Sequence, residues 1–393
     1  MTSQAPLRIN IEFVSAYPSR PLRGEDAYAA IIGDVLARMA GQLGHQVSRE
    51  YYVNDAGPQA DALARGVYAR VLTPSAFEDD EITALATTVR KRLPEALFDS
   101  PEASWLSPLR SATVAAAMER ITADLEALGV AFDVFTAESS LETKGALRKL
   151  LDDFASKAAL MDAAGNLLQT APEPPLARLM LDTTARGDLR PRALTDSDGR
   201  YTYYAADLAY HADKMARSFD LMIDVFRKDH AAYAPGLVAG VDLISASQTK
   251  LSVCLIDPVR PPSEADPSPR VAAPLAALPK LEALLAFYGA PLLRRLFLSH
   301  APGKPLALAC DPATRRALKA AEERQLAALA LPETGASDAP DALAEIASAF
   351  EARTPHKLMA ATDALASASL AARSLSKEAK SGLLAMRAAL GFT

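Results

Sequence analysis

The sequence predicts an α/β fold with an open sheet, a largely helical insertion and a mainly α-helical C-terminal region. Residues 7–53 read as strand, helix and strand, the unit that open α/β sheets repeat. Residues 55–128 and the chain beyond 275 read almost wholly as helix. The chain has 393 residues, enough for two or three domains. It is rich in Ala and Leu and has only 6% aromatic residues, a composition that favours helices.

The first elements follow from hydrophobic periodicity. Residues 7–14 alternate apolar and polar side chains, as a strand does. Apolar residues then recur at helical spacing from Ala29 to Met39, and glycines follow at 41 and 44. Residues 46–53 give a second strand. In open sheets of this kind, ligands bind at the carboxyl ends of the strands, so we expect a site beyond residues 14 and 53.

The remaining elements divide the chain into three parts. Further predicted elements are a strand at 130–135, a helix at 144–159, a hairpin-like stretch at 178–205 with a turn at Asp198-Gly199, a helix at 205–218 and a strand at 221–226. Prolines at 258, 261, 262, 267 and 269, which stand among charges, mark 257–275 as a linker or surface loop. We therefore predict a first domain over 1–256 with a helical insertion at about 58–128, the Pro-rich linker, and a helical domain over 276–393.

Composition excludes several classes of function. The formal charge of −6 gives no overall attraction to nucleic acid. Cys254 and Cys310 lie in apolar settings without zinc-ligand spacing, so both are predicted to be buried, reduced thiols. We expect no metal and no cofactor. The sequence has no signal pattern and no apolar run long enough to span a membrane, which predicts a cytoplasmic protein without membrane contact.

Several segments resemble arginyl-tRNA synthetase, in the order found in that family. The matching segments are residues 10–22 (NIEFVSAYPSRPL), 29–34, 49–57 (REYYVNDAG), 132–140, 197–211 (SDGRYTYYAADLAYH) and 218–225. The resemblance covers 8–235 and implies the class I synthetase fold, a doubly wound Rossmann-like domain that forms arginyl-adenylate. The sequence near His356 is weakly similar to the family's anticodon-binding domain. Because the match begins at residue 8, we expect the family's N-terminal tRNA-binding domain to be missing.

The residues at the family's ATP motifs differ from the family pattern. The family's His-x-Gly-His stands at Arg23-Gly24-Glu25-Asp26, where carboxylates would repel a polyphosphate; we expect a solvated turn. Arg227 replaces a glycine in the family's Gly-x-Asp, whose aspartate matches Asp229. No Lys-Met-Ser-Lys sequence occurs in 245–300. Since adenylate formation needs prepositioned donors and cations at the phosphates, these differences predict that activation is lost and that no residue is catalytic.

By the same resemblance, Glu12, Ser15, Tyr203 and Asp207 match positions that hold the amino and guanidinium groups of arginine. A guanidinium binds well to a carboxylate and an aromatic face, and residues 203 and 207 can share a helix face. Tyr17 replaces an asparagine of the family, which alters the pocket. Alternatively, these residues only stabilise the fold, with Glu12 accepting backbone hydrogen bonds and Asp207 pairing with Lys214 or Arg217, or the cleft holds a new ligand.

Three functions remain open. The first is a noncatalytic, synthetase-like pseudoenzyme that acts as a binding or regulatory subunit, with arginine or a similar cation as ligand or with a protein partner. The second is an enzyme with altered chemistry that joins an amino acid to an acceptor other than tRNA. The third, RNA binding without catalysis, is disfavoured by the net charge, and we expect no tRNA partner.

Overall fold

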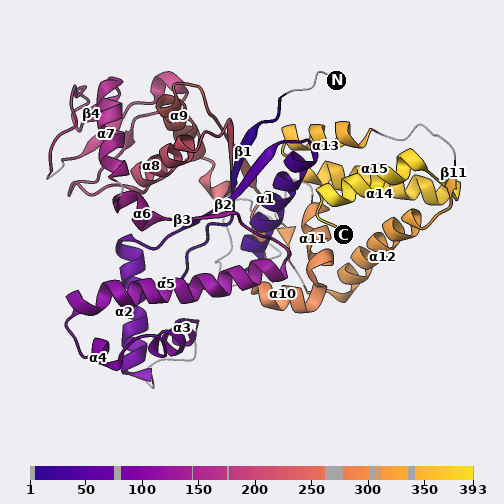
Figure 1. Cartoon of the computed structure of the whole chain (residues 1–393), viewed down its shortest axis with the longest axis horizontal. Helices are drawn as coiled ribbons and strands as arrows, with labels where there is room; N and C mark the ends of the chain where they lie inside the picture. The colour runs from indigo at the N-terminus through magenta and orange to yellow at the C-terminus, as the bar shows by residue number, and fades with distance from the viewer. Residues whose placement is uncertain are drawn as a thin grey trace.

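The computed structural model describes most of the chain, in eight segments (Figure 1). These segments are residues 5–74, 81–143, 145–174, 177–261, 278–300, 306–308, 310–334 and 341–392. In the described residues no helix is long and apolar enough to cross a membrane. The described parts of the chain form an α/β fold with a parallel central sheet and a helical C-terminal region, as predicted.

The central sheet is parallel and has the strand order β3-β2-β1-β7-β8. Its strands are β1 (Arg8–Glu12), β2 (Gln46–Val53), β3 (Val134–Ala137), β7 (Leu221–Arg227) and β8 (Lys250–Ile256). The prediction for β2 matches its bounds, whereas the strand predicted at 130–135 lies slightly later in the chain. The edge strand β8 was missed, because its apolar residues follow no clean two-residue alternation. Since all five strands are parallel, their carboxyl ends meet at one edge of the sheet.

Helix α1 (Gly24–Gln42) lies between the sheet and the C-terminal helices, and its residues are buried along nearly its whole length. One hydrophobic core joins Ile9 and Ile11 of β1 to Leu36 of α1 and to Phe297 and Met386 of the C-terminal region. This shared core explains why α1 is buried all round rather than on one stripe. The packing of the sheet and of the C-terminal helices is therefore coupled through α1.

Two further units have cores of their own. The insertion between β2 and β3 contains α2 (Gly57–Leu72), α3 (Glu81–Arg90), α4 (Glu95–Phe98) and α5 (Glu102–Ala127). Between β3 and β8 lie α6 (Glu138–Thr143), α7 (Ala146–Ser156), β4 (Leu160–Asp162), β5 (Leu179–Leu181), η2 (Thr184–Arg186), β6 (Arg192–Ala193), α8 (Tyr203–Ala216), η3 (Lys228–His230) and α9 (Ala234–Ser245). Strands β4, β5 and β6 form a small antiparallel sheet. The predicted hairpin is present, with Thr195 bridged to Tyr201 around the turn.

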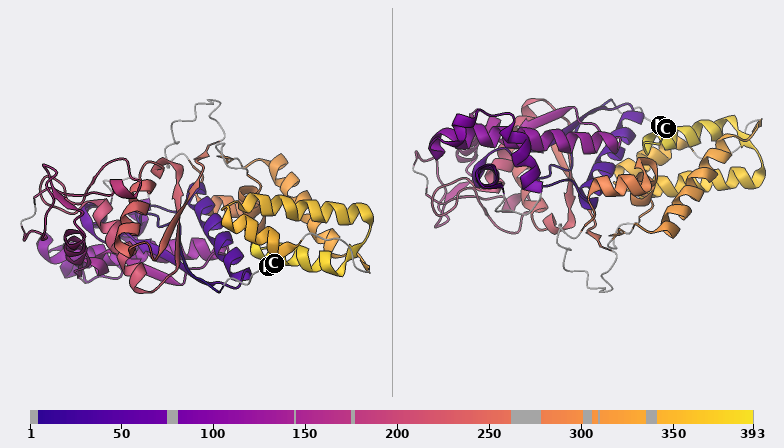
Figure 2. Two further views of the ribbon diagram at one scale, coloured as in Figure 1. Left: turned by 90° about the horizontal axis from the view of Figure 1, so that it is seen from above. Right: turned by 90° about the horizontal axis from the view of Figure 1, so that it is seen from below.

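The C-terminal region is helical and extends to one end of an elongated molecule (Figure 2). It contains α10 (Leu281–Tyr288), α11 (Ala290–Leu298), α12 (Pro312–Leu329), α13 (Ala342–Glu351), α14 (Pro355–Ala372) and α15 (Lys377–Ala389). Short parallel pairs join β9 (Val259–Arg260) to β10 (Leu306–Ala307) and β11 (Glu333–Thr334) to β12 (Leu375–Ser376). Of the predicted Pro-rich linker, 257–261 is ordered around β9, and 262–275 lies outside the described residues.

The two cysteines differ from each other. Cys254 is buried in β8, and burial raises the pKa of its thiol to about 11. Cys310 is exposed, so the prediction that both thiols are buried was wrong for Cys310. Leu306 and Leu308, shortly before it in the sequence, are buried, so an apolar sequence context did not make Cys310 itself buried.

Candidate functional site

A row of three acidic residues crosses the central sheet near its carboxyl edge. Glu50 of β2 and Asp224 of β7 are both in register with Glu12 of β1, so their side chains lie on the same face of adjacent strands. Glu12 is 9% exposed and the other two are fully buried. Three carboxylates that lie this close together and away from solvent need positively charged side chains as partners.

Helix α8 supplies those cations. The Nζ atom of Lys214 lies 2.6 Å from Oε2 of Glu12 and 3.3 Å from Oδ1 of Asp224. Asp224 also contacts Nε2 of His211 at 2.9 Å, and Arg217 donates to Glu50 at 2.8 Å. Glu50 further accepts from Asn10 at 2.6 Å. The buried acids are therefore paired within the fold.

The pKa values follow from this pairing. Burial raises the pKa of Glu12 to about 7, against the opposing effect of Lys214. Burial also raises that of Asp224, but Lys214 and His211 outweigh it and lower its pKa to about 2. Burial and Lys214 disfavour protonated His211, yet Asp224 and Asp207 raise its pKa to about 10. Lys214 itself has a raised pKa, since the nearby carboxylates outweigh its burial. We conclude that Asp224 is ionised and that Lys214 and His211 carry its countercharge.

Glu12, His211 and Asp224 also bring ligand atoms within 4.8 Å of one another, close enough for a metal ion. However, the Lys214 ammonium makes direct contacts with two of these three residues. The Lys214 ammonium is thus already bound to the carboxylate groups that a metal ion would need as ligands. The cluster is better described as an internal ion network than as a metal centre.

Ser15 lies in the turn after β1, next to this network. Val14 and Ser15 both have positive φ angles, 69° and 39°, which turn the chain sharply at the carboxyl end of the strand. The Ser15 hydroxyl donates to Oε1 of Glu12 at 3.0 Å and accepts from the backbone N–H of Tyr52 at 3.1 Å. Glu12 therefore accepts from the Ser15 hydroxyl and the Lys214 ammonium, and no backbone donor to it is found among the described residues.

Asp207 and Tyr203 share a face of α8, as predicted. The Tyr233 hydroxyl donates to Oδ2 of Asp207 at 2.6 Å, and the ring of Tyr233 lies 5.3 Å from that of Tyr203. Nδ1 of His211 is 3.1 Å from Oδ1 of Asp207. The alternative pairing of Asp207 with Lys214 or Arg217 is wrong, because those side chains turn toward the acidic row of the sheet.

A cavity of about 630 Å³ opens beside these residues. Its described lining residues are Tyr17, Tyr52, Asn54, Ala56, Gly57, Pro58, Gln59, Glu138, Leu141, Leu147, Arg200, Tyr201, Thr202, Tyr203, Ala206 and Ala209. Of the five residues predicted to bind arginine, only Tyr17 and Tyr203 are in this lining. Glu12, Ser15 and Asp207 are not, and they form the polar network next to it.

Tyr52, Asn54 and Glu138 line the cavity but were not among the predicted site residues. A signal was available for two of them, because Tyr52 lies near the end of β2 and Asn54 follows it, at the carboxyl edge of the sheet, where open sheets bind ligands. Glu138 begins α6 directly after β3, at the same edge. Their convergence on Tyr17 and Tyr203 depends on strand order, which the sequence did not supply.

The six residues predicted to form an altered nucleotide site come together at the start of α1. Asp26 accepts from the backbone N–H of Arg23 at 2.7 Å and caps the helix. It also receives two hydrogen bonds from Arg20, at 2.6 and 3.0 Å. Arg227 lies 3.4 Å from Oε2 of Glu25 and also pairs with Asp229. Burial raises the pKa of Glu25 despite Arg227.

The segment before α10 covers this helix end. The N–H of Gly24 donates to the carbonyl of Pro279 at 3.1 Å, and that of Leu281 donates to the carbonyl of Leu22 at 2.8 Å. The Arg23 guanidinium donates to the carbonyl of Leu278 at 2.8 Å. One prediction needs correction: the turn at 23–26 is not solvated, because the segment 278–281, far away in the sequence, covers it. Its two carboxylates are paired with Arg20 and Arg227.

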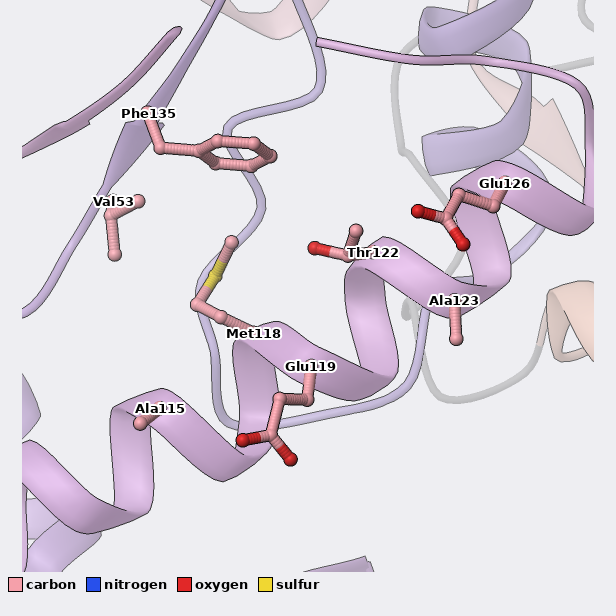
Figure 3. Close-up of a pocket in the computed structure, with 8 residues that line it drawn as sticks. All are labelled: Val53, Ala115, Met118, Glu119, Thr122, Ala123, Glu126 and Phe135. Carbon is pink, nitrogen blue, oxygen red and sulfur yellow. The ribbon is translucent and has the colours of Figure 1, made fainter.

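A second hollow, of about 550 Å³, lies along α5 (Figure 3). The side chains of Met118 and Thr122 on α5 face Phe135 and Val53 across it, and two glutamates stand on the same helix. One of them, Glu119, makes an exposed ion pair with Arg92 at 2.6 Å. None of the predicted site residues lines this hollow.

The known proteins described below to which the chain is similar are all arginine–tRNA ligases or arginyl-tRNA synthetases. No protein-family profile matches the chain. The arginine–tRNA ligases of Ruegeria pomeroyi and Paracoccus denitrificans are each 35% identical to it over 272 residues, covering 64% of this chain and 46% of each relative. The chain thus spans about half the length of the curated relatives it matches.

The fold comparison agrees with the sequence comparison. A Campylobacter jejuni protein described as a candidate arginyl-tRNA synthetase has a TM-score of 0.72 and 23% identity, covering 98% of this chain and 91% of that one. The Thermus thermophilus arginyl-tRNA synthetase has a TM-score of 0.67 and 17% identity, covering 98% and 81%. The chain is therefore similar to arginine–tRNA ligases in sequence over about two thirds of its length, and it has the arginyl-tRNA synthetase fold.

Proposed function

We propose that this protein is an arginyl-tRNA synthetase-like binding or regulatory protein that holds arginine or a similar cation and does not form arginyl-adenylate. The observation that carries the proposal is the occupied N-terminus of α1. Its backbone and side chains are engaged by Pro279, Arg20 and Arg227. Two steps support the loss of activation, and the cavity supports the binding role.

The first step concerns the helix end. The N-terminus of a helix attracts phosphate because its N–H groups are unpaired and its dipole is positive there. Here Asp26 caps the helix, and the N–H of Gly24 is bonded to Pro279. A triphosphate would have to displace both partners and approach two carboxylates. That costs free energy that binding would need to recover.

The second step concerns Arg227 at the end of β7. Its side chain spans from the strand to Glu25 on α1, across the place where the resemblance would have a glycine packed against adenosine. An arginine in this position removes the close backbone approach that glycine allows. Arg227 and the occupied N-terminus of α1 would both hinder the binding of the same ligand, ATP. Together with the missing Lys-Met-Ser-Lys sequence in 245–300, they favour a protein without adenylation.

The binding role rests on the cavity beside β1, β2 and α8. Tyrosine rings and Glu138 line it, and a guanidinium or ammonium group fits such a lining through cation–π contacts and charge pairing. The ion network of Glu12, Lys214 and Asp224 lies behind it and holds β1 and α8 together. We infer that this network preserves the shape of the pocket.

Two measurements test the proposal. In ATP–pyrophosphate exchange with each of the twenty amino acids, we expect no exchange above the rate without enzyme. Exchange with any amino acid would overturn the loss of activation and favour an enzyme that joins amino acids to another acceptor. Isothermal titration with arginine and with simple guanidines tests binding; no heat and no thermal shift at millimolar ligand would remove the binding role.

A further inference from the structure

The hollow along α5 has an apolar lining that faces solvent. Met118 of α5 lies on one side of it, and Val53 of β2 and Phe135 of β3 lie on the other (Figure 3). Phe135 is 44% exposed, and Met118 is only partly buried. Since covering apolar surface is favourable, this lining gains free energy when another apolar group fills the hollow.

Of the two glutamates at the hollow, only one lacks a partner. Glu119 pairs with Arg92 at 2.6 Å. Glu126 is exposed, and none of the described residues forms an ion pair with it. Met118, Thr122 and Glu126 follow one another at four-residue intervals, which places them on the same face of the helix. The hollow therefore combines an apolar lining with one unpaired negative charge.

The loop between η2 and β6 presents the opposite combination. Leu189 is 94% exposed, more than any other large hydrophobic residue in the described part of the chain. Arg190 beside it is also exposed and forms no ion pair with a described residue. Single exposed leucines are common on protein surfaces. This leucine differs because the loop that carries it has a fixed shape.

A buried carboxylate fixes that shape. The Asp188 side chain is fully buried, accepts from the N–H of Leu189 at 2.8 Å, and accepts from the Arg192 guanidinium at 2.7 and 2.8 Å. Gly187 has a φ angle of 94°, in the left-handed region, and turns the chain just before Asp188. A loop that is already ordered loses little conformational entropy when it docks.

We propose that this loop of one copy of the chain docks into the α5 hollow of a second copy. Leu189 enters the apolar part between Met118 and Phe135, and Arg190 pairs with Glu126. The hollow of about 550 Å³ is large enough to take the tip of a loop. Each surface supplies what the other lacks, because the leucine and the cation belong to the loop while the uncovered ring and the acid belong to the hollow.

The two surfaces are different, so the contact is heterologous. A copy that has used its loop still has a free hollow, and copies therefore add head to tail into a ring or an open chain. Because only a loop tip is covered, the contact belongs to the class of small, weak interfaces. Its ion pair is exposed at the rim, so salt weakens it. This association does not depend on the proposed cation ligand, and its failure would leave the proposed function untouched.

Sedimentation equilibrium of the full chain at rising protein concentration tests the inference. We expect the weight-average mass to increase with concentration, and to increase less when about 1 M salt screens the ion pair. At about 1 mM protein, even a dissociation constant of about 1 mM gives measurable association. A chain that remains monomeric there would overturn the inference and would leave the hollow to a different partner.

Variants of exposed residues assign the contact. Leu189→Asp removes the apolar tip of the loop, and Glu126→Arg reverses the charge of the hollow; we expect each to weaken association at least about tenfold. Mixed together, the two variants should form one heterodimer and nothing larger, because one keeps an intact hollow and the other an intact loop. Leu384→Asp, at a leucine of α15 that is 50% exposed, is the control and should associate like the unaltered chain.

The mixture separates this contact from any other mode of association. Thermal melts confirm that each variant is folded. Association that survives Leu189→Asp or Glu126→Arg would overturn the assignment, since other surfaces would then carry the contact. A mixture that stays monomeric would overturn the head-to-tail arrangement.

Discussion

The Nζ atom of Lys214 on α8 lies 2.6 Å from a carboxylate oxygen of Glu12 on β1, although 202 residues separate them in the chain. The same ammonium reaches Asp224 on β7. This one side chain therefore joins a helix to two adjacent strands through buried charge. We therefore expect removal of the Lys214 ammonium to destabilise the whole sheet.

The first prediction concerns that removal. Lys214→Met leaves Glu12 and Asp224 buried without their main cation, and we expect it to lower the free energy of unfolding by about 3–5 kcal/mol. Urea denaturation at pH 7 measures the change. The control is Lys380→Met, which breaks the exposed pair with Glu333 and should cost no more than about 1 kcal/mol. Similar losses in both variants would contradict the burial argument.

The second prediction concerns pH. The pKa of His211 is raised from 6.5 to about 10 in the fold, so the folded state holds a proton that the unfolded state releases between these values. The resulting stabilisation is complete below about pH 6.5 and is lost as the pH rises toward 10. We expect the free energy of unfolding to fall between pH 6.5 and 9. In His211→Asn this fall should be much smaller; equal slopes would show that His211 is not the group responsible.

Glu12 adds a separate effect at lower pH. Its pKa is raised from 4.5 to about 7, so its contribution to stability is present below about pH 4.5 and declines as the pH rises toward 7. The pKa of Asp224 is lowered from 3.8 to about 2, which has the opposite sign: its contribution is present above about pH 3.8 and is lost as the pH falls toward 2. Glu12→Gln should flatten the profile between pH 4.5 and 7 in denaturant titrations. A profile unchanged there would argue that Glu12 stays ionised.

The third prediction compares two glycines of α1. A Cβ at Gly33 would lie 2.1 Å from the buried ring of Phe13, whereas a Cβ at Gly41 would meet nothing within 4 Å. We expect Gly33→Ala to destabilise the protein by about 1–3 kcal/mol through overpacking. Gly41→Ala should instead stabilise it by up to about 1 kcal/mol, because alanine is the better helix former. Thermal and urea unfolding measure both; a neutral Gly33→Ala would mean that Phe13 moves at no cost.

The fourth prediction concerns the bridge between β7 and α1. Arg227→Ala leaves Glu25, which is 6% exposed, without its arginine. Since the Arg227 side chain is 35% exposed and solvent screens the pair, we expect a loss of only about 1 kcal/mol in the free energy of unfolding. Arg200→Ala, in an exposed pair, should have no measurable effect. A loss no greater than that of the control would indicate that Glu25 needs no counter-charge.

Much of the fold could be predicted from the sequence. The alternation in β1 and the helical spacing in α1 are local patterns, and they identify elements because side-chain burial repeats with the geometry of each element. The edge strand β8 could not be identified this way. Its burial alternates poorly, so its character as a strand depends on pairing with β7.

The sequence alone identified the first strand–helix–strand unit, the helical insertion and the residues Tyr17 and Tyr203, because periodicity and similarity are properties of the chain itself. Tertiary structure alone decided which distant groups pair: Lys214 with Glu12 and Arg227 with Glu25 as ion pairs, and the Pro279 carbonyl with the N–H of Gly24 as a hydrogen bond. Each of these pairs joins segments about two hundred or more residues apart. A parallel sheet brings such segments to one edge, and the contacts made there depend on strand order and register, which no local pattern encodes.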